Sequence, residues 1–231
     1  MSIAENIARV RANIAAAARE AGREASEITL VGASKMNDAE ACRAAIAAGI
    51  DALGENREQE MTKKLAEHAY DGAPLHFIGH LQRNKVKNVV GKVALIESVG
   101  SLELLAAVDK QAEKLQIVQD ILLEVNIGGE EAKSGFAPEE LSQAAQEARR
   151  CENVRVRGLM CIPPVAEGEH GSLPYFEKVH ALFVDINAKL YDNTLDILSM
   201  GMSGDYEDAV RAGATMVRVG TAIFGARNYT N

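Results

Sequence analysis

Lys35 and Arg218 are the residues whose types and surroundings first suggest chemistry in this chain. Lys35 ends the segment Val31–Lys35. Arg218 lies in the segment Met216–Val219, which comes just before Gly220-Thr221. A lysine that is partly desolvated near a cation has a lowered pKa, so its neutral amine can attack an aldehyde and form a Schiff base. From its position alone, Lys35 could also be a solvated loop residue, which is the commoner case for lysine.

Glycine and hydroxyl residues near the C-terminus are typical of a phosphate-binding site. The segment Ser199–Ser203 ends one predicted strand, and Gly220-Thr221 follows the next. The loops after strands seven and eight are where (β/α)8 barrels often bind phosphate. Either segment alone could consist of ordinary turn glycines and caps, but the two together favour a phosphate site. Ser203 misses the G-x-S-x-G nucleophile elbow by one place, which argues against a serine hydrolase.

Arg218 has two possible roles. It could be a core arginine of a barrel, paired with a carboxylate. Alternatively it could face a pyridine nitrogen. A guanidinium cannot accept a proton and disfavours a pyridinium, so such a ring would be a weaker electron sink than one partnered by Asp. The second role therefore predicts limited carbanion chemistry.

Two further polar residues follow predicted strands. Asn56 could hydrogen-bond a ligand oxygen or only cap the next helix, which is the commoner use of asparagine there. His80 could form a polar wall of the same site. The histidines lack metal-ligand spacing with an acidic partner, and no H-E-x-x-H or Walker loop occurs, so no metal is predicted.

Eight short apolar segments, mostly alternating with helix-like ones, must position these residues. Alternation predicts a parallel sheet, and strands without polar alternation predict burial of both its faces. No G-x-G-x-x-G follows the first strand, and polar residues follow many different strands, which favours a closed (β/α)8 TIM barrel over an open doubly wound sheet. The predicted strands are Ile28–Ser34, Asp51–Glu55, Leu75–His80, Val93–Val99, Asp120–Ile127, Val154–Cys161, Leu195–Met200 and Met216–Val219.

An additional amphipathic helix, Ser2–Gly22, precedes the first strand and is expected to cover the barrel wall beside the eighth. Between the strands we expect helices at Asp38–Ala48, Arg57–His68, Ser101–Lys114, Pro138–Arg150, Pro174–Tyr191 and Tyr206–Ala212, and a basic helix from Arg83 to Lys92.

Length and composition set the broad class. The 231 residues fit one barrel domain, 1–231, and 33 acidic against 25 basic residues make a nucleic-acid partner a poor expectation. Three scattered cysteines without C-x-x-C suggest neither disulfides nor zinc and fit a reducing cytoplasm. No window reaches the apolar run of about 18 residues that a membrane span needs.

In order along the whole chain, these motifs resemble those of the pyridoxal 5′-phosphate (PLP) homeostasis proteins, single-domain relatives of the alanine racemase N-terminal barrel. The resemblance is carried by Ser34-Lys35, Gly54-Glu55-Asn56, His76–Gln82 with Asn84-Lys85, Val125-Asn126-Ile127, Lys133-Ser134-Gly135, Gly158-Leu159-Met160, Leu198–Ser203 and Val217–Gly225. One departure is Met36-Asn37-Asp38, where the family often has Thr-Lys-Pro.

The resemblance implies a fold-type III barrel that carries PLP on Lys35 as an internal aldimine. It places the phosphate at Ser199 or Ser203 with Gly220-Thr221, and Arg218 beside the ring nitrogen. The cofactor-binding residues so implied are Lys35, Asn56, Ser199, Met200, Gly201, Ser203, Arg218, Gly220 and Thr221.

The resemblance also implies that the protein is not an enzyme, because the family binds, buffers and hands over PLP without robust catalysis. PLP-dependent apoenzymes would be its partners, and the basic segment Arg83–Lys92 could dock one, hold a second PLP or be a solvated face. The alternatives are a fold-type III amino-acid racemase or decarboxylase and, less favoured, a sugar-phosphate enzyme without PLP. A racemase needs two bases, Lys35 supplies one, and Tyr206 is the nearest but weakly placed tyrosine. We expect no catalytic residues, and a monomer.

Overall fold

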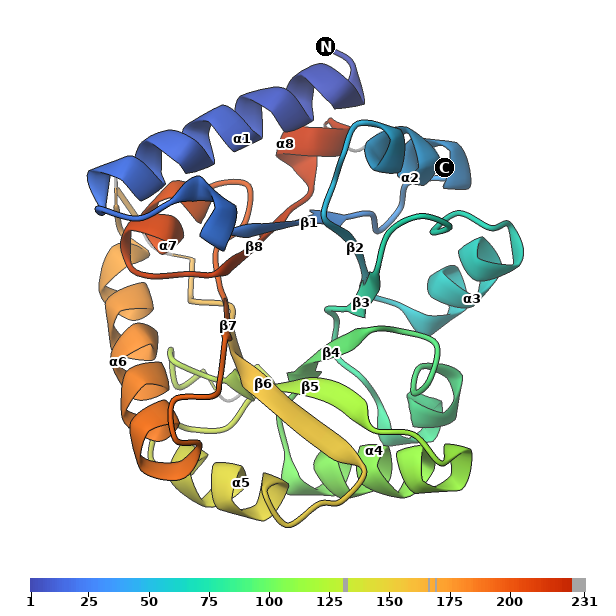
Figure 1. Ribbon diagram of the computed structural model, residues 1–231, viewed down its shortest axis with the longest axis vertical. Helices are drawn as coiled ribbons and strands as arrows, with labels where there is room; N and C mark the ends of the chain where they lie inside the picture. The colour runs from blue at the N-terminus through green and yellow to red at the C-terminus, as the bar shows by residue number, and fades with distance from the viewer. Residues whose placement is uncertain (131–132, 166, 169, 226–231) are drawn as a thin grey trace.

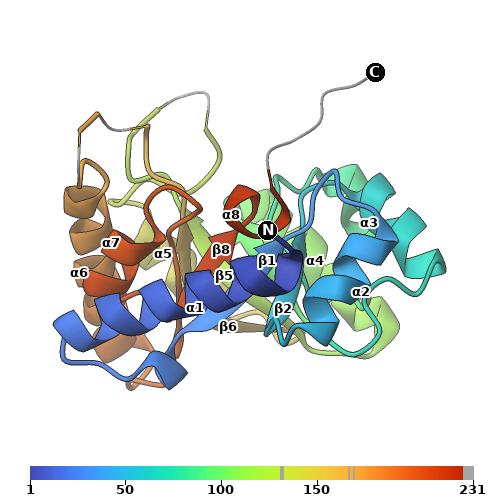
Figure 2. The ribbon, with the colours of Figure 1, turned by 90° about the horizontal axis from the view of Figure 1, so that it is seen from above.

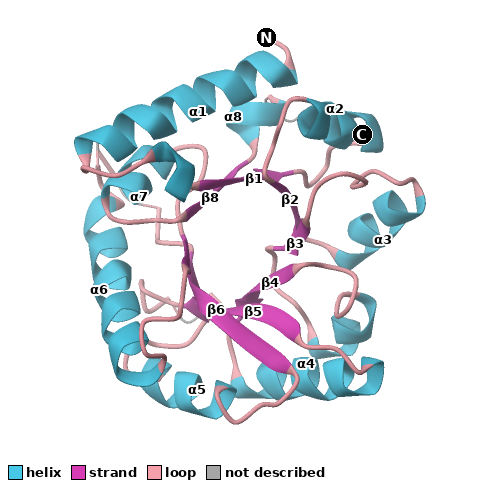
Figure 3. Ribbon diagram, viewed as in Figure 1, coloured by secondary structure: helices cyan, strands magenta, loops and turns pink. Residues whose placement is uncertain are grey.

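The computed structural model describes residues 1–130, 133–165, 167–168 and 170–225, and in them eight parallel strands form a closed barrel in the order β1 to β8 (Figures 1 and 3). The predicted TIM barrel is therefore confirmed. Closure is completed by β1 and β8, with Thr29 opposite Met216 and Val31 opposite Arg218. The strands are β1 Thr29–Ala33, β2 Ala52–Glu55, β3 Leu75–Phe77, β4 Leu95–Val99, β5 Gln119–Val125, β6 Val154–Cys161, β7 Ile197–Ser199 and β8 Met216–Val219.

Helices surround the strands, as Figure 3 shows. They are α1 Ile3–Glu20, α2 Ala39–Ala47, α3 Glu58–Ala66, α4 Leu102–Leu115, α5 Leu141–Ala148, α6 Leu173–Leu190, α7 Tyr206–Arg211 and α8 Thr221–Phe224, with 3-10 turns η1 Ala25–Glu27 and η2 Arg83–Asn88. The predicted α-helix from Arg83 to Lys92 is wrong, because this segment forms the 3-10 turn η2. The predicted start at Pro138 is also wrong, since α5 begins at Leu141. The sequence pattern missed α8, which is one turn long.

The barrel has an apolar layer on its outside, and an apolar and a polar layer inside it. Outside, the helices pack on the strands in one large cluster of buried residues. Inside, alternate strand residues meet in a separate cluster made of Val31, Ala52, Leu95, Leu122, Met160 and Met216. The next inward residues toward the carboxyl ends of the strands include His76, Glu97, Glu124 and Arg218, all buried. The barrel is therefore apolar in its middle and polar beneath the face where barrel enzymes place their sites.

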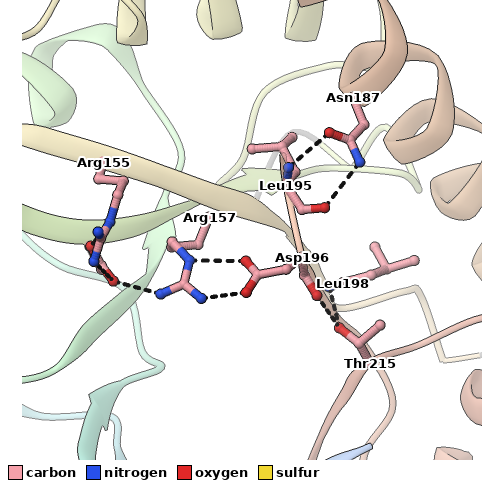
Figure 4. A network of polar contacts seen from close by, with 8 residues as sticks. Arg155, Arg157, Asn187, Leu195, Asp196, Leu198 and Thr215 are labelled. Carbon is pink, nitrogen blue, oxygen red and sulfur yellow. Dashed lines mark hydrogen bonds and ion pairs between the residues drawn. The ribbon is translucent and has the colours of Figure 1, made fainter. Parts of the chain in front are cut away.

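Ion pairs close the amino-terminal end of the barrel (Figure 4). Arg157 on β6 pairs with Asp120 on β5 at 2.8 Å and with Asp196, which lies just before β7. Arg155 adds a second pair to Asp120 at 2.7 Å. Burial favours a raised pKa of Asp120, but the two arginines outweigh it and hold this pKa below its usual value. The network ties three consecutive strands together at the end opposite the predicted ligand face.

The N-terminal helix covers the closure between β8 and β1, as predicted. Figure 2 shows α1 running along α7 and α8, and buried Ile7, Val10 and Ile14 form its inner stripe. The Asn6 side chain donates to the Ile223 carbonyl oxygen at 2.8 Å. Ser2 caps the helix, its hydroxyl accepting from the Glu5 amide. The first and last elements described thus hold each other on the barrel wall.

Candidate functional site

Lys35 and Gly220-Thr221 meet in one cavity at the carboxyl ends of β1 and β8. This cavity of about 260 Å³ is lined by both segments, together with Met36–Asp38, Ala41 and Phe224. The two strands are hydrogen-bonded neighbours, so residues at the two ends of the chain are brought side by side. The structure therefore brings Lys35 and the predicted phosphate segment Gly220-Thr221 to one place.

Backbone amides and one hydroxyl gather at the rim of this cavity. The Ser203 hydroxyl accepts hydrogen bonds from the amides of Gly220, at 3.1 Å, and Ala222, at 3.3 Å. Ser203 thus joins the loop after β7 to the start of α8, Thr221–Phe224. Amides at such a turn favour an anion, and a hydroxyl beside them can donate to one. The predicted phosphate residues Ser203, Gly220 and Thr221 are assembled at one place.

Ser199 and Met200 lie deeper than that rim. Both are fully buried, and the Ser199 hydroxyl donates to Glu97 at 2.6 Å while accepting from Arg218. Of the two serines considered for the phosphate, Ser203 is therefore the one at the rim. Gly201 has φ +90°, and a Cβ there would stand 2.5 Å from that of Ala209, so a glycine is needed for α7 to pack closely.

Arg218 is held on several sides within the polar layer of the barrel. It is 3% exposed, its guanidinium donates to the Cys161 carbonyl oxygen at 2.8 Å, and it lies 3.6 Å from Glu97. His76 lies on the other oxygen of Glu97, at 2.8 Å. These contacts show Arg218 as a core arginine paired with a carboxylate, the first of the two roles considered. A place for the guanidinium beside a pyridine nitrogen stays a prediction.

Glu97 is the centre of this polar layer. Burial alone would raise its pKa, but the hydrogen bond and charge of His76, with the charge of Arg218 and the bond from Ser199, outweigh burial and lower the pKa. Glu97 is therefore a carboxylate that fixes three neighbours. The sequence analysis missed it, although a glutamate in the apolar strand Leu95–Val99 is a usable signal, because buried charges are seldom found without partners.

Asn56 lines a separate hollow of about 260 Å³, together with Arg57, His80 and Lys85. Its Oδ1 atom is buried and has no hydrogen-bond partner among the described residues, and Arg57 occupies the N-cap position of α3. The helix-cap alternative for Asn56 is therefore wrong, and its contact with a ligand stays a prediction. A buried amide oxygen that lacks a partner is costly, so it is the kind of group that a ligand satisfies. Gly79 lets the backbone approach here, since a Cβ on it would stand 2.2 Å from the Asn56 carbonyl oxygen.

Two larger hollows are lined in part by His80. One of about 730 Å³ contains His80, Arg83, Ser101 and Lys133, and one of about 470 Å³ contains His80 and Glu124. Burial raises the pKa of Glu124, with Ser134, Arg218 and His80 opposing it, and its Oε2 atom has no hydrogen-bond partner among the described residues. His80 lines both of these hollows, and its expected place as a wall of the Lys35 site stays a prediction. The basic segment is partly neutralised, because Lys85 pairs with Glu58.

A second buried ion cluster lies beneath the loop of Lys35. Lys64 on α3 contacts Glu55 and Glu60, each at 2.7 Å, and Tyr70 donates to Glu55 at 3.0 Å. Burial raises the pKa of Glu55 against the opposing effect of Lys64. Sequence reasoning missed Lys64, because a lysine in a helix is ordinarily a solvated residue.

The described part of the chain offers neither a cluster of metal ligands nor a helix able to span a membrane. No group of three or more histidine, cysteine, aspartate or glutamate residues within it could hold a metal ion. None of its helices is long and apolar enough to cross a membrane.

Comparison with known proteins relates the site to a family. Residues 6–228 match the family described as "Alanine racemase, N-terminal domain". A pyridoxal phosphate homeostasis protein of Aquifex aeolicus is 43% identical over 99% of this chain and 100% of its own length, and one of Pseudomonas aeruginosa is 42% identical over 99% and 97%. The structure of PipY from Synechococcus elongatus with PLP bound is 31% identical, covers 97% of this chain and 100% of its own, and has a TM-score of 0.84.

Proposed function

The chain belongs to the family of the alanine racemase N-terminal domain and to its pyridoxal phosphate homeostasis proteins, and we propose that it binds PLP covalently through Lys35 and serves in PLP homeostasis. The observation that carries this proposal is the cavity shared by Lys35 with Gly220-Thr221. It offers an amine for an aldehyde at one side and amides for a phosphate at the other. PipY, whose chain is covered over its full length, has been crystallised with PLP.

Each residue of the site has a proposed part in holding the cofactor. Ser203, Gly220 and Thr221 bind the phosphate through a hydroxyl and backbone amides. The buried Oδ1 atom of Asn56, which has no partner among the described residues, accepts a hydrogen bond from the ligand. Ser199, Met200 and Gly201 shape the floor beneath, and Arg218 presents a fixed positive charge to the ring. PLP supplies an aldehyde that lysine can take up and a ring that can act as an electron sink.

We further propose that the protein holds PLP without turning over a substrate. Arg218 cannot leave its place, because Glu97, Ser199 and Cys161 fix it, and a permanent cation there opposes protonation of a pyridine ring. Tyr206, the tyrosine considered as a second base, is 6% exposed and its hydroxyl accepts from Asn13 on α1. Neither residue supports proton transfer to a substrate α-carbon from a second face.

The proposed role includes delivery or buffering within the cytoplasm by a monomer. The three cysteines are unpaired, which suits a reducing compartment. PLP-dependent apoenzymes are the partners this role requires. Light scattering of the PLP-loaded protein checks the monomer, and transfer of PLP to an added apoenzyme checks delivery.

The proposal is tested by replacing Lys35 with alanine. We expect purified wild-type protein incubated with PLP to show a visible absorption band, and borohydride to fix a pyridoxyl mass on the peptide of residue 35. Lys35→Ala loses both. The matched control is Lys63→Ala, whose side chain is 78% exposed and pairs only distantly with Glu67.

Two results would count against the proposal. If Lys35→Ala keeps the band and the borohydride label, PLP is not attached at this lysine. If the wild-type protein exchanges the α-proton of amino acids with solvent deuterium at rates of about 1 per second or faster, the protein is an enzyme of the racemase or decarboxylase type.

A further inference from the structure

Lys64 is unusual because its ammonium group lies beneath the loop that carries Lys35. Lys64 is 4% exposed, and its Nζ lies 2.8 Å from the Ser34 carbonyl oxygen and 2.7 Å from one oxygen each of Glu55 and Glu60. An ammonium has three donors, and each of these acceptors can take one. Burial disfavours the charge, but the bonds to the two carboxylates outweigh it, so the pKa of Lys64 lies above its usual value.

The two carboxylates beside this ammonium hold the residues on either side of Lys35. The Ser34 hydroxyl donates to Glu55 Oε1 at 2.6 Å. On the other side, the Met36 amide donates to Glu60 Oε1 at 2.6 Å. These two hydrogen bonds, with the one from the Lys64 ammonium to the Ser34 carbonyl oxygen, fix the backbone immediately before and after Lys35.

Met36 is the place where this loop most needs a restraint. Its φ is +61°, a left-handed conformation that residues other than glycine seldom adopt, and its side chain is exposed rather than packed. The hydrogen bond from the Met36 amide to Glu60 therefore holds the backbone at Met36, which side-chain packing does not hold. The direction in which Lys35 leaves the loop depends on this conformation, since the two residues are adjacent.

Stability alone is a weak reason for such a cluster. Replacing a buried ion pair by apolar residues of similar size is often neutral or stabilising, because desolvation offsets the attraction. Apart from the hydrogen bond that Tyr70 donates to Glu55, the contacts that leave this cluster are directed at Ser34 and Met36, the two neighbours of Lys35. Orientation of that residue accounts for the arrangement better than a contribution to folding.

We propose that Lys64 is a positioning residue for Lys35: with Glu55 and Glu60 it forms a clamp, the Lys64 clamp, that aims the Lys35 amine into the cavity shared with Gly220-Thr221. The inference rests on the proposed function for the role of Lys35 toward PLP. The clamp itself is a property of the protein without ligand, so it can be tested separately.

The first experiment follows amide exchange in the ligand-free protein. NMR should find the Met36 amide protected in the wild type and exchanging at least about tenfold faster in Lys64→Met. Lys63→Met is the matched control on the exposed side of the same helix, and it should leave the Met36 amide unchanged. Unchanged protection in Lys64→Met would overturn the clamp.

The second experiment measures the rate at which PLP becomes attached, by the growth of the absorption band. Because a misplacement of about 1 Å can cost a factor of a hundred, we expect Lys64→Met to load about 10 to 100 times more slowly than wild type or Lys63→Met. A rate within about twofold of wild type would contradict the positioning role. Absence of the band in the wild type would sink the proposed function instead, and the exchange experiment would still decide on the clamp.

A milder variant guards against loss of folding in Lys64→Met. Glu60 has a side chain 22% exposed, and Glu60→Ala removes the acceptor of the Met36 amide while leaving Glu55 paired. It should speed exchange at Met36 and slow PLP loading, with an unchanged circular dichroism spectrum. If both quantities match those of the wild type, the clamp does not hold the loop.

Discussion

At the scale of single residues, the site is built from charges that are held rather than mobile. Glu97 fixes Arg218 through a direct contact and through Ser199, and the Lys64 clamp fixes the neighbours of Lys35. Each buried ion has several partners, which is what makes its burial tolerable. Glu124 and Glu55 each have one carboxylate oxygen without a hydrogen-bond partner in the described part of the chain.

Glu124 gives a prediction about pH. Burial raises its pKa in the folded protein, so between its unfolded and folded pKa values the folded state binds more protons than the unfolded state. Stability is therefore lost as the pH rises through this interval. We expect Glu124→Gln, which cannot ionise, to be more stable than wild type by roughly 1 kcal/mol at pH 8. The difference should vanish near pH 4.

Urea unfolding at several pH values measures this difference. Glu152→Gln, at an exposed position, is the control and should show no such pH-dependent gain. A Glu124→Gln protein that is less stable than wild type at pH 8 would mean that the carboxylate is needed in its charged form.

At the scale of elements, short strands are placed by close backbone approaches. β6 and β7 pair through Gly158 opposite Ile197, at a shift in the register with β5. A Cβ at position 158 would stand 1.7 Å from the Ile197 carbonyl oxygen. This distance is impossible for real atoms, so the pairing of these strands requires a glycine.

Gly158→Ala should therefore be strongly destabilising. We expect a loss of about 3 kcal/mol or more in the free energy of unfolding, because backbone rather than a flexible side chain must move. Gly204→Ala is the control, since a Cβ there meets nothing within 4 Å. Urea unfolding followed by circular dichroism measures both. If the free energy of unfolding of Gly158→Ala lies within about 1 kcal/mol of that of the wild type, the two strands can move apart at little cost in stability.

The elements also mark what the sequence allows one to predict. The alternation of apolar and amphipathic segments was sufficient to predict all eight strands, because hydrophobic periodicity is a local property of the sequence. The basic segment was misassigned as an α-helix, and the single turn of α8 was missed, because short elements depend on tertiary contacts. Strand-end positions and turn chemistry indicated Lys35, Gly220-Thr221 and either Ser199 or Ser203, and the structure places Lys35 and Gly220-Thr221 in one cavity. Glu97 and Lys64 were not, since their partners come from strands and loops distant in sequence.

At the scale of the whole molecule, the barrel has a ligand face and a sealed face. Arg157 links β5 to the segment before β7 at the sealed end, through Asp120 and Asp196. The same pairs keep the pKa of Asp120 low despite burial. A group with a lowered folded pKa stabilises above its unfolded pKa and loses that contribution as the pH falls through the folded value.

Arg157→Met should weaken the barrel at neutral pH. We expect a loss of about 1 to 3 kcal/mol at pH 7, because two aspartates lose their shared partner. The loss should shrink as the pH falls from the pKa of a free aspartate, about 3.9, through the lower pKa of Asp120 in the folded protein, because Asp120 becomes protonated there. Arg155→Met is the control, with a side chain 63% exposed and one partner, and should cost less. Equal losses in the two variants, compared by thermal unfolding, would contradict a special role for Arg157.

The pairing of Thr29 with Met216 has a consequence for the order of events when the protein is made. Gly220 and Thr221 leave the ribosome long after Lys35 does. Contacts between such distant segments carry a large loop-closure entropy and slow folding. Lys35 and Gly220-Thr221 cannot line one cavity until β8 has been made and has paired with β1, so we expect tight capture of PLP to report that the barrel has closed.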